Sequence, residues 1–191
     1  MYDLIPYAPA ERLDNPATGE VAEIETSALA DGGCASILFT LPAHAEGAPP
    51  HFHTSYDETF AVIEGALELR IGPALERRIL HAGEYAIIRR GAYHAFRNAG
   101  ATRVTFRTVA SQGRSFERFI RAWYGLGRNG DFANGAPRNP LHLAMALDAG
   151  DINLVGPPAG LQRVLRRALA RLARLSGADK AVTQHWETAD V

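Results

Sequence analysis

The chain has 191 residues, of which 47% are hydrophobic, so it is long enough to bury a sizeable core in one domain, with or without an appendage. Its formal net charge of −1 gives no reason to expect nucleic acid as a partner, because nucleic-acid surfaces attract strongly basic proteins. The single cysteine, Cys34, excludes an internal disulfide, and neither a signal-peptide core nor a run of about 18 apolar residues is present, so we expect a cytoplasmic protein with no transmembrane segment.

The first 110 residues have the pattern of a mainly β domain. An irregular arm is expected over the first 20 residues, where Asn15-Pro16 and Thr18-Gly19 are typical turn pairs. After the arm, apolar and polar residues alternate over short stretches that are separated by turns, most of them marked by glycine. The predicted strands cover residues 21–29, 35–41, 59–71 (two strands folded at Glu64-Gly65), 76–80, 85–88 and 102–109. Many short strands at nearly even spacing favour a β-sandwich or a β-barrel.

After residue 110 the pattern becomes helical. Helices are expected over 115–124, 141–147 and 158–175, and a polar tail follows them. Asn139-Pro140 strengthens the second helix, because an asparagine side chain caps a helix start and proline suits the first helical position. We therefore divide the chain into a β-barrel with its N-terminal arm, residues 1–110, and a helical extension, residues 111–191, packed on the barrel or on a partner subunit.

The last predicted helix, 158–175, is amphipathic. Its apolar stripe consists of Leu161, Val164, Leu165, Ala168, Leu169, Leu172 and Leu175. Five arginines and no acid lie largely off the stripe: Arg163, Arg166, Arg167, Arg171 and Arg174. This composition suits a helix that binds a membrane surface or an anion. Because the protein has no net basic charge, we favour instead a helix that packs on the barrel or on a partner subunit and leaves its arginines in solvent.

Metal-ligand chemistry is concentrated in one stretch of the β domain. His51 and His53 are two residues apart, so in a β-strand their side chains point to the same face. Glu58 follows after the turn-prone Thr54-Ser55 and can return on the next strand as a third ligand, with the adjacent Asp57 as a rival. Imidazole nitrogens and a carboxylate oxygen suit Zn, Fe, Ni, Cu or Mn.

A second stretch, residues 83–98, adds His94 after the turn at Gly91, and the two stretches together resemble the two signature motifs of the cupin superfamily. The matching positions are His51, His53, Glu58 and Gly65 in the first motif and Gly83, Gly91, His94 and Asn98 in the second. The sequence departs from the family pattern twice. Arg89 stands where the family usually has proline, and three residues rather than the usual five separate Gly47 from His51.

The resemblance covers about residues 21–110 and implies both a fold and a site. The implied fold is a double-stranded β-helix, that is, a jelly-roll barrel, here followed by C-terminal α-helices. The implied metal ligands are His51, His53, Glu58 and His94, holding one divalent transition metal (Fe, Mn, Ni, Cu or Zn). Glu58 is preferred over Asp57 because it alone leaves six residues before Gly65. The same carboxylate is the expected catalytic group, either as a ligand or as a general base.

The resemblance leaves several functions open, because one fold serves many of them. The chain is similar to small single-domain, quercetinase-like cupins, which implies a metal-dependent oxygenase acting on a small hydroxylated or aromatic substrate. The alternatives are a non-catalytic module that binds or senses a small molecule, and a sugar isomerase or epimerase. Because cupins often pair through their sheets, a homodimer is also expected.

Overall fold

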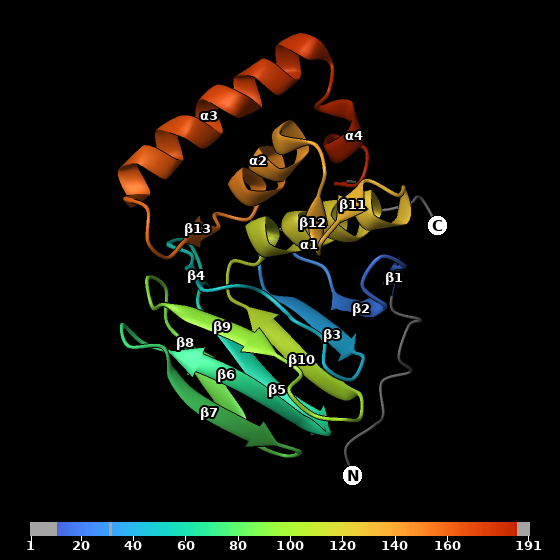
Figure 1. Cartoon of the computed structure of the whole chain (residues 1–191), viewed down its shortest axis with the longest axis vertical. Coiled ribbons are helices and arrows are strands. Elements are labelled where there is room, and N and C mark those ends of the chain that lie inside the picture. The colour runs from blue at the N-terminus through green and yellow to red at the C-terminus, as the bar shows by residue number, and fades with distance from the viewer. Residues whose placement is uncertain (1–10, 31, 187–191) are drawn as a thin grey trace.

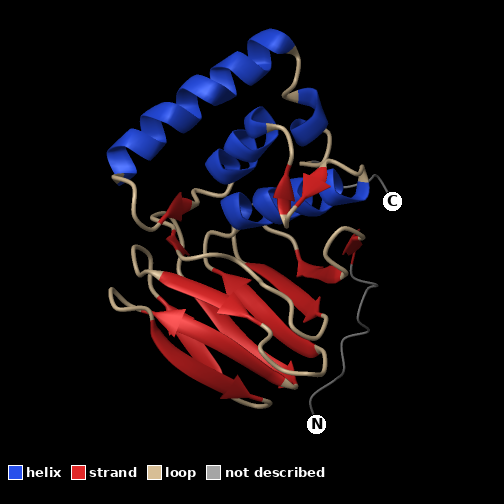
Figure 2. Ribbon diagram, viewed as in Figure 1, coloured by secondary structure: helices blue, strands red, loops and turns tan. Residues whose placement is uncertain are grey.

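The alternating segments of the first 110 residues form two antiparallel sheets, and the helices gather at one end of them (Figures 1 and 2). The computed structural model describes residues 11–30 and 32–186. In spatial order, the first sheet contains β1 (Glu11–Asn15), β2 (Glu20–Thr26), β3 (Ala35–Leu41), β10 (Val104–Ala110), β5 (Glu58–Glu64) and β8 (Tyr85–Ile88). The second contains β13 (Asn153–Leu154), β4 (His51–Phe52), β9 (His94–Arg97), β6 (Ala66–Ile71) and β7 (Glu76–His81). The predicted class, a double-stranded β-helix with C-terminal helices, is confirmed.

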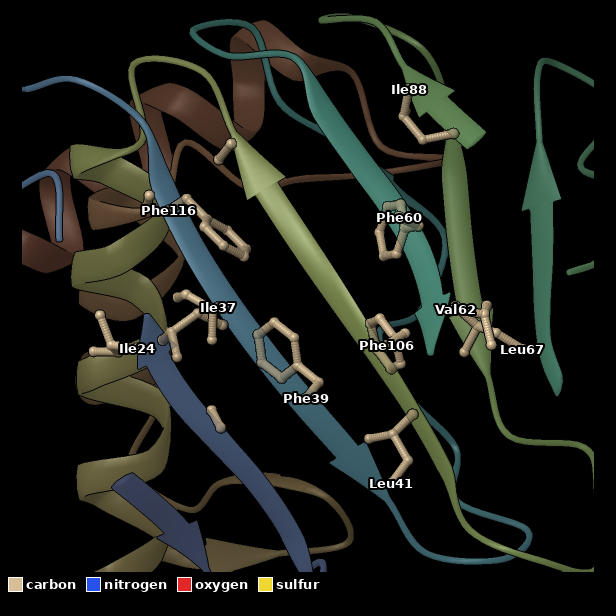
Figure 3. Close-up of a cluster of buried hydrophobic side chains, with 14 of the residues drawn as sticks. Ile24, Ile37, Phe39, Leu41, Phe60, Val62, Leu67, Ile88, Phe106 and Phe116 are labelled. Atoms are coloured by element: carbon tan, nitrogen blue, oxygen red, sulfur yellow. The ribbon is translucent and has the colours of Figure 1, made fainter. Parts of the chain in front are cut away.

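The core of the barrel follows directly from the period-2 pattern of the central strands. Every second residue of β3 and of β10 is buried, and the two strands pair with Phe39 opposite Phe106. These two rings stack with their centroids 5.4 Å apart, and Phe60 stacks on Phe106 from the neighbouring strand at 6.0 Å (Figure 3). Burial of such large apolar side chains is the main stabilising contribution to a β-sandwich of this kind.

Gly65 makes the turn between β5 and β6 that the motif places there. Its φ of +83° lies in the left-handed region, and an added Cβ would lie 2.8 Å from the carbonyl oxygen of Arg103. Only glycine meets both conditions without strain. The turn returns the chain from the first sheet to the second, directly after the strand that begins with Glu58.

The helical extension forms successive layers on the end of the barrel (Figure 1). Its helices are α1 (Arg114–Arg128), α2 (Pro140–Ala149), α3 (Ala159–Ser176) and α4 (Lys180–Thr183), with a hairpin of β11 (Phe132–Ala133) and β12 (Ala136–Pro137) after α1. Helix α1 contacts β1 and β3, α2 packs on α1, and α3 packs on α2 as the outermost layer. As predicted, Asn139 caps α2: its side chain accepts a hydrogen bond from the backbone N–H of Leu141 at 2.9 Å.

A buried ion pair fastens α1 to the barrel. The carboxylate of Glu117 accepts hydrogen bonds from Arg121 Nε at 2.9 Å, from the Ser27 hydroxyl at 2.8 Å and from the backbone N–H of Ala28 at 2.6 Å. Arg121 also donates to Glu11 at 2.8 Å. The side chains of Glu117 and Arg121 are almost completely buried, so the charge of Glu117 depends on Arg121 for compensation.

The structure differs from the sequence-based expectations in several places. Strands β4, β9, β11, β12 and β13 lie outside the predicted strand ranges, and three further differences concern the arm, the tail and α3. Residues 1–10 of the expected arm lie outside the described residues, but 11–15 form strand β1 rather than irregular chain. The expected tail includes α4, and its last residues, 187–191, also lie outside the described part. The third difference is that α3 packs through Arg166, Ala170 and Ala173, so its leucine stripe does not face the barrel. Among the described residues, no helix is both long and apolar enough to cross a membrane.

Candidate metal centre

Three strands bring the predicted ligands to the same end of the barrel. His51 is the first residue of β4, and His53 follows that strand directly. His94 is the first residue of β9, which pairs with β4 so that His51 and His94 are opposite each other. Glu58 is the first residue of β5 in the other sheet. The site therefore lies between the two sheets, with histidines from one and the carboxylate from the other.

His53, Glu58 and His94 form a buried group whose ligand atoms all lie within 4.8 Å of one another. Glu58 Oε2 is 3.1 Å from His53 Nε2 and 3.2 Å from His94 Nε2. His51 is outside this group but adjacent to it, with its ring centroid 4.2 Å from that of His94 and 6.2 Å from that of His53. The structure thus brings three of the four predicted ligands together and places the fourth beside them.

Backbone carbonyls fix the orientation of all three imidazoles. The Nδ1 atoms of His51 and His53 each lie 2.8 Å from a carbonyl oxygen, that of Pro49 and that of Tyr56 respectively. The Nδ1 atom of His94 lies 3.1 Å from the carbonyl oxygen of Ala92. A carbonyl only accepts hydrogen bonds, so each Nδ1 is the donor and each neutral ring keeps the lone pair on Nε2. This is the orientation that metal-binding histidines usually have.

The resulting arrangement fits a cation. The Nε2 lone pairs of His53 and His94 face an oxygen of the Glu58 carboxylate at hydrogen-bond distance, and such acceptors repel unless a proton or a metal ion lies between them. Nitrogen and carboxylate donors of this kind match divalent transition metals. The residues present therefore fit the metal that the sequence motifs imply.

The charge state of the site also suits a metal. Burial, together with the neighbouring His94, lowers the pKa of His51 to about 3, so this imidazole is neutral. Burial alone would raise the pKa of Glu58, but when a proton lies on the facing Nε2 atoms of His53 and His94, their hydrogen bonds and positive charge outweigh burial and hold that pKa well below its ordinary value. Deprotonated ligands are what metal binding requires.

Asp57, the rival carboxylate, is engaged elsewhere. It accepts hydrogen bonds from the backbone N–H of Arg90 and from the Arg89 side chain, both at 2.9 Å, and these contacts lower its pKa to about 2. Arg89 is the residue that stands where the family usually has proline. The geometry therefore groups Glu58, and not Asp57, with the histidines.

Tyr56 supports the site and was not singled out from the sequence. Its ring stacks on that of His53 with centroids 3.8 Å apart, and its backbone carbonyl accepts the hydrogen bond from His53 Nδ1. Its hydroxyl donates to the carbonyl of Gly150 at 3.2 Å, and its burial raises the pKa of this phenol well above the ordinary value. An aromatic residue between the second histidine and the glutamate is the signal that points to this role.

The helical extension holds the ligand-bearing strand directly. Strand β13 pairs with β4, so that Leu154 lies opposite His51, and the backbone N–H of Val155 donates to the carbonyl of Pro50 at 3.0 Å. Beside them, the Asp151 carboxylate accepts hydrogen bonds from the backbone N–H and the hydroxyl of Thr54 at 2.6 and 2.8 Å. The extension is therefore part of the framework that positions the histidines.

Comparisons with known proteins bear on the family of the chain. A family model described as "Cupin domain" matches residues 37–110, the segment that contains all four predicted ligands. An uncharacterised protein of Aquifex aeolicus (strain VF5) is 34% identical over 88 residues, which are 46% of this chain and 69% of that protein. The chain belongs to the cupin superfamily.

Solved structures align with somewhat more than half of this cupin. A sugar phosphate isomerase of the cupin superfamily from Silicibacter pomeroyi aligns with a TM-score of 0.46 and 25% identity, over 53% of this chain and 71% of that one. The polyketide cyclase RemF from Streptomyces resistomycificus aligns with a TM-score of 0.47 and 19% identity, over 59% of this chain and 80% of that one. Neither likeness carries an activity over to this cupin.

A cavity of about 580 Å³ lies between the barrel of this cupin and its helical extension, and His51 is the predicted ligand that lines it. The extension contributes an apolar wall that mixes aromatic and aliphatic side chains: Phe119, Ile120, Trp123, Tyr124, Leu143, Leu147, Ile152 and Leu154. Phe39, Leu41 and Phe96 of the barrel add to this wall, and Glu20, Glu46, Glu68, Arg70 and Arg97 supply the charged part. A cavity of this size and lining is typical of a site for a small organic molecule.

Glu68 anchors the charged part of the cavity wall. Its buried carboxylate accepts hydrogen bonds from Arg97 at 2.9 Å, from Arg77 at 2.8 Å and from Arg70 at 3.2 Å. The hydrogen bond from Arg97, with that from Arg77, outweighs burial and lowers the pKa of Glu68 to about 2. The carboxylate is therefore ionised at every pH at which the protein is expected to work.

This network predicts a loss of stability in acid. A carboxyl group whose pKa is lower in the folded state than its ordinary value of 4.5 stabilises the fold above that value. The stabilisation is lost as the pH falls from about 4.5 towards about 2. Thermal unfolding of the wild-type protein and of Glu68→Gln should therefore differ near neutral pH and converge in acid. A difference that stays constant over that range would contradict the assignment.

Proposed function

We propose that this cupin is a metal-dependent oxygenase that acts on a small hydroxylated or aromatic substrate. The observation that carries the proposal is the position of the cavity, whose apolar walls include several aromatic side chains and which reaches the candidate metal centre at His51. Aromatic side chains such as Trp123 and Phe119 offer stacking surfaces to a flat substrate and keep water away from it.

In the proposed site, His51, His53, Glu58 and His94 hold one divalent transition metal. When bound, such an ion supplies a Lewis acid for a substrate hydroxyl and, if it is redox-active, a binding position for O2. Glu58 is anionic in the buried site, which suits a metal ligand. It would serve as a base for a substrate hydroxyl only where His53 and His94 bind the metal and no longer donate hydrogen bonds to it. Tyr56 and β13 keep the histidines in position during this reaction.

The same proposal includes the surroundings in which the protein works. We propose a small-molecule ligand and no nucleic-acid partner, in line with the net charge of −1. A cytoplasmic location and a homodimer complete the proposal. Light scattering of the purified protein tests the homodimer directly.

Oxygen uptake tests the proposed activity. Protein loaded separately with Fe, Mn, Ni, Cu or Zn would be mixed with a panel of phenols, and O2 would be followed with an electrode. A dioxygenase places both oxygen atoms in the product and needs no external reductant, so one O2 should disappear for each substrate consumed. Trp123→Ala should raise KM more than it lowers kcat, because it removes binding surface rather than a ligand.

Two results would contradict the oxygenase. Thermal stabilisation by a phenol without any O2 uptake would indicate a binding or sensing module. Interconversion of sugars without O2 would indicate an isomerase or epimerase. His81→Ala is the matched control for loss of a histidine, because His81 is exposed on β7 and takes no part in the site.

A further inference from the structure

Helix α3 has three distinct faces. The face towards the protein contains Ala170, Ala173, Arg166 and Gln162. Gln162 binds β13 through both polar atoms of its side-chain amide: Oε1 accepts from the backbone N–H of Leu154 at 2.9 Å, and Nε2 donates to the carbonyl of the same residue at 2.8 Å. Arg166 donates to the carbonyl of Ile152. Small and polar residues therefore attach the helix, and the leucines are not needed for it.

The second face is apolar and exposed. Leu161, Val164, Leu165, Leu172 and Leu175 are between 51% and 79% exposed, although large apolar residues on one helix are normally buried. They recur at spacings of three, four and seven residues, which places them in one stripe on the side away from Ala170 and Ala173. Helix α3 is the outermost layer of the extension (Figure 1). The stripe is exposed and lies opposite the packed face of the helix, so it faces away from the body of the protein.

The third face carries the charge. Arg163, Arg167, Arg171 and Arg174 are exposed on the flank between the other two faces, and α3 has no acidic residue. Within the described part of the chain, none of the four makes an ion pair. Arg166 differs from them, since it lies 3.7 Å from Asp148 on the packed side. The exposed half of α3 thus combines an apolar stripe with four positive charges that have no ion-pair partner among the described residues.

We infer that α3 is a docking helix for the surface of an anionic membrane. A helix lying in the bilayer interface places leucines among the acyl chains and arginines among the phosphate groups, which is the division that α3 presents. A second copy of the chain fits this face less well. Pairing α3 with itself would bring together the arginines of both helices with no carboxylate from either, and like charges disfavour such an interface.

Sedimentation of the full-length protein with vesicles tests this inference. We expect binding to vesicles that mix phosphatidylglycerol with phosphatidylcholine, and little binding to phosphatidylcholine alone. Binding should weaken as salt is added, because salt screens exposed charges. Equal binding to both lipids, or no binding to either, would overturn the inference.

Paired variants separate the charged flank from the apolar stripe. Arg167→Glu with Arg171→Glu should lower the partition constant for anionic vesicles by about tenfold or more. Each basic residue near such a surface raises that constant by somewhat less than about tenfold, and this variant removes two of them. Val164→Glu with Leu172→Glu should weaken it to a similar degree by placing charge in the acyl region. Unchanged partitioning of either double variant would overturn the inference.

A matched control and a second readout complete the test. Ile63→Glu with Ile87→Glu makes the same change at two residues of the barrel that are 50% and 48% exposed, and this variant should bind vesicles like the wild type. Light scattering without lipid shows whether Val164→Glu with Leu172→Glu changes the oligomeric state. If this variant dissociates a dimer while the wild type ignores vesicles, a second copy covers the stripe and the inference is wrong.

Discussion

A His94→Ala variant is expected to bind a divalent transition metal at least about a hundredfold more weakly than the wild-type protein. Losing a residue that merely orients a ligand typically costs 10- to 100-fold in metal affinity, so losing a ligand should cost at least the upper end of that range. His94 is completely buried, and its Nε2 lies 3.2 Å from the Glu58 carboxylate, where water cannot readily take its place. The measurement is a calorimetric titration of metal-free protein with each ion, which gives the dissociation constant.

His81→Ala should bind each metal as tightly as the wild type does, because His81 is an exposed residue of β7 that lies outside the site. Thermal unfolding of both metal-free variants shows that each is folded before the titration begins. An affinity of His94→Ala equal to that of His81→Ala would exclude His94 as a ligand. Weakened binding in Asp57→Ala together with unchanged binding in Glu58→Ala would assign the carboxylate to the rival residue.

Replacing Arg121 by alanine is expected to lower the free energy of unfolding by about 3–5 kcal/mol. The substitution leaves Glu117 buried with only the neutral donors of Ser27 and Ala28, so its charge is no longer compensated. Because this pair joins α1 to the barrel, the loss also weakens the attachment of the helical extension. Urea unfolding followed by circular dichroism measures the change.

The double variant Glu117→Gln with Arg121→Met tests whether an uncompensated charge is the cause. It removes both charges and keeps most of the side-chain volume, so it should be more stable than Arg121→Ala. If the double variant loses more stability than Arg121→Ala, then packing or the neutral hydrogen bonds, and not charge compensation, dominate at this position.

The sequence was sufficient to predict the barrel because its features are local. Period-2 alternation identified β3 with its full bounds. The spacing of the histidines was compatible with a strand at β4, but β4 and β9 lie outside the predicted strand ranges. The motif positions also named His53, Glu58 and His94, which the fold brings together from separate strands. Local spacing succeeds here because each ligand stands at the start of a strand or next to one, where register decides its direction.

The contribution of the extension could not be predicted in the same way. Strand β13 has two residues, too few for any periodic pattern, and its pairing with β4 depends on how α1 and α2 place the chain. The amphipathic pattern of α3 was read correctly as a stripe, but a stripe does not say what it faces. Gln162, Arg166 and two alanines attach that helix by specific contacts, which override the usual burial of leucine.

The metal content of protein purified without added metal or chelator tests the central claim most directly. Mass spectrometry should find about one equivalent of a divalent transition metal in the wild type and in His81→Ala, and almost none in His53→Ala, because His53, Glu58 and His94 converge on one buried point. A full equivalent in His53→Ala, or no metal in the wild type, would contradict the metal centre described for this cupin.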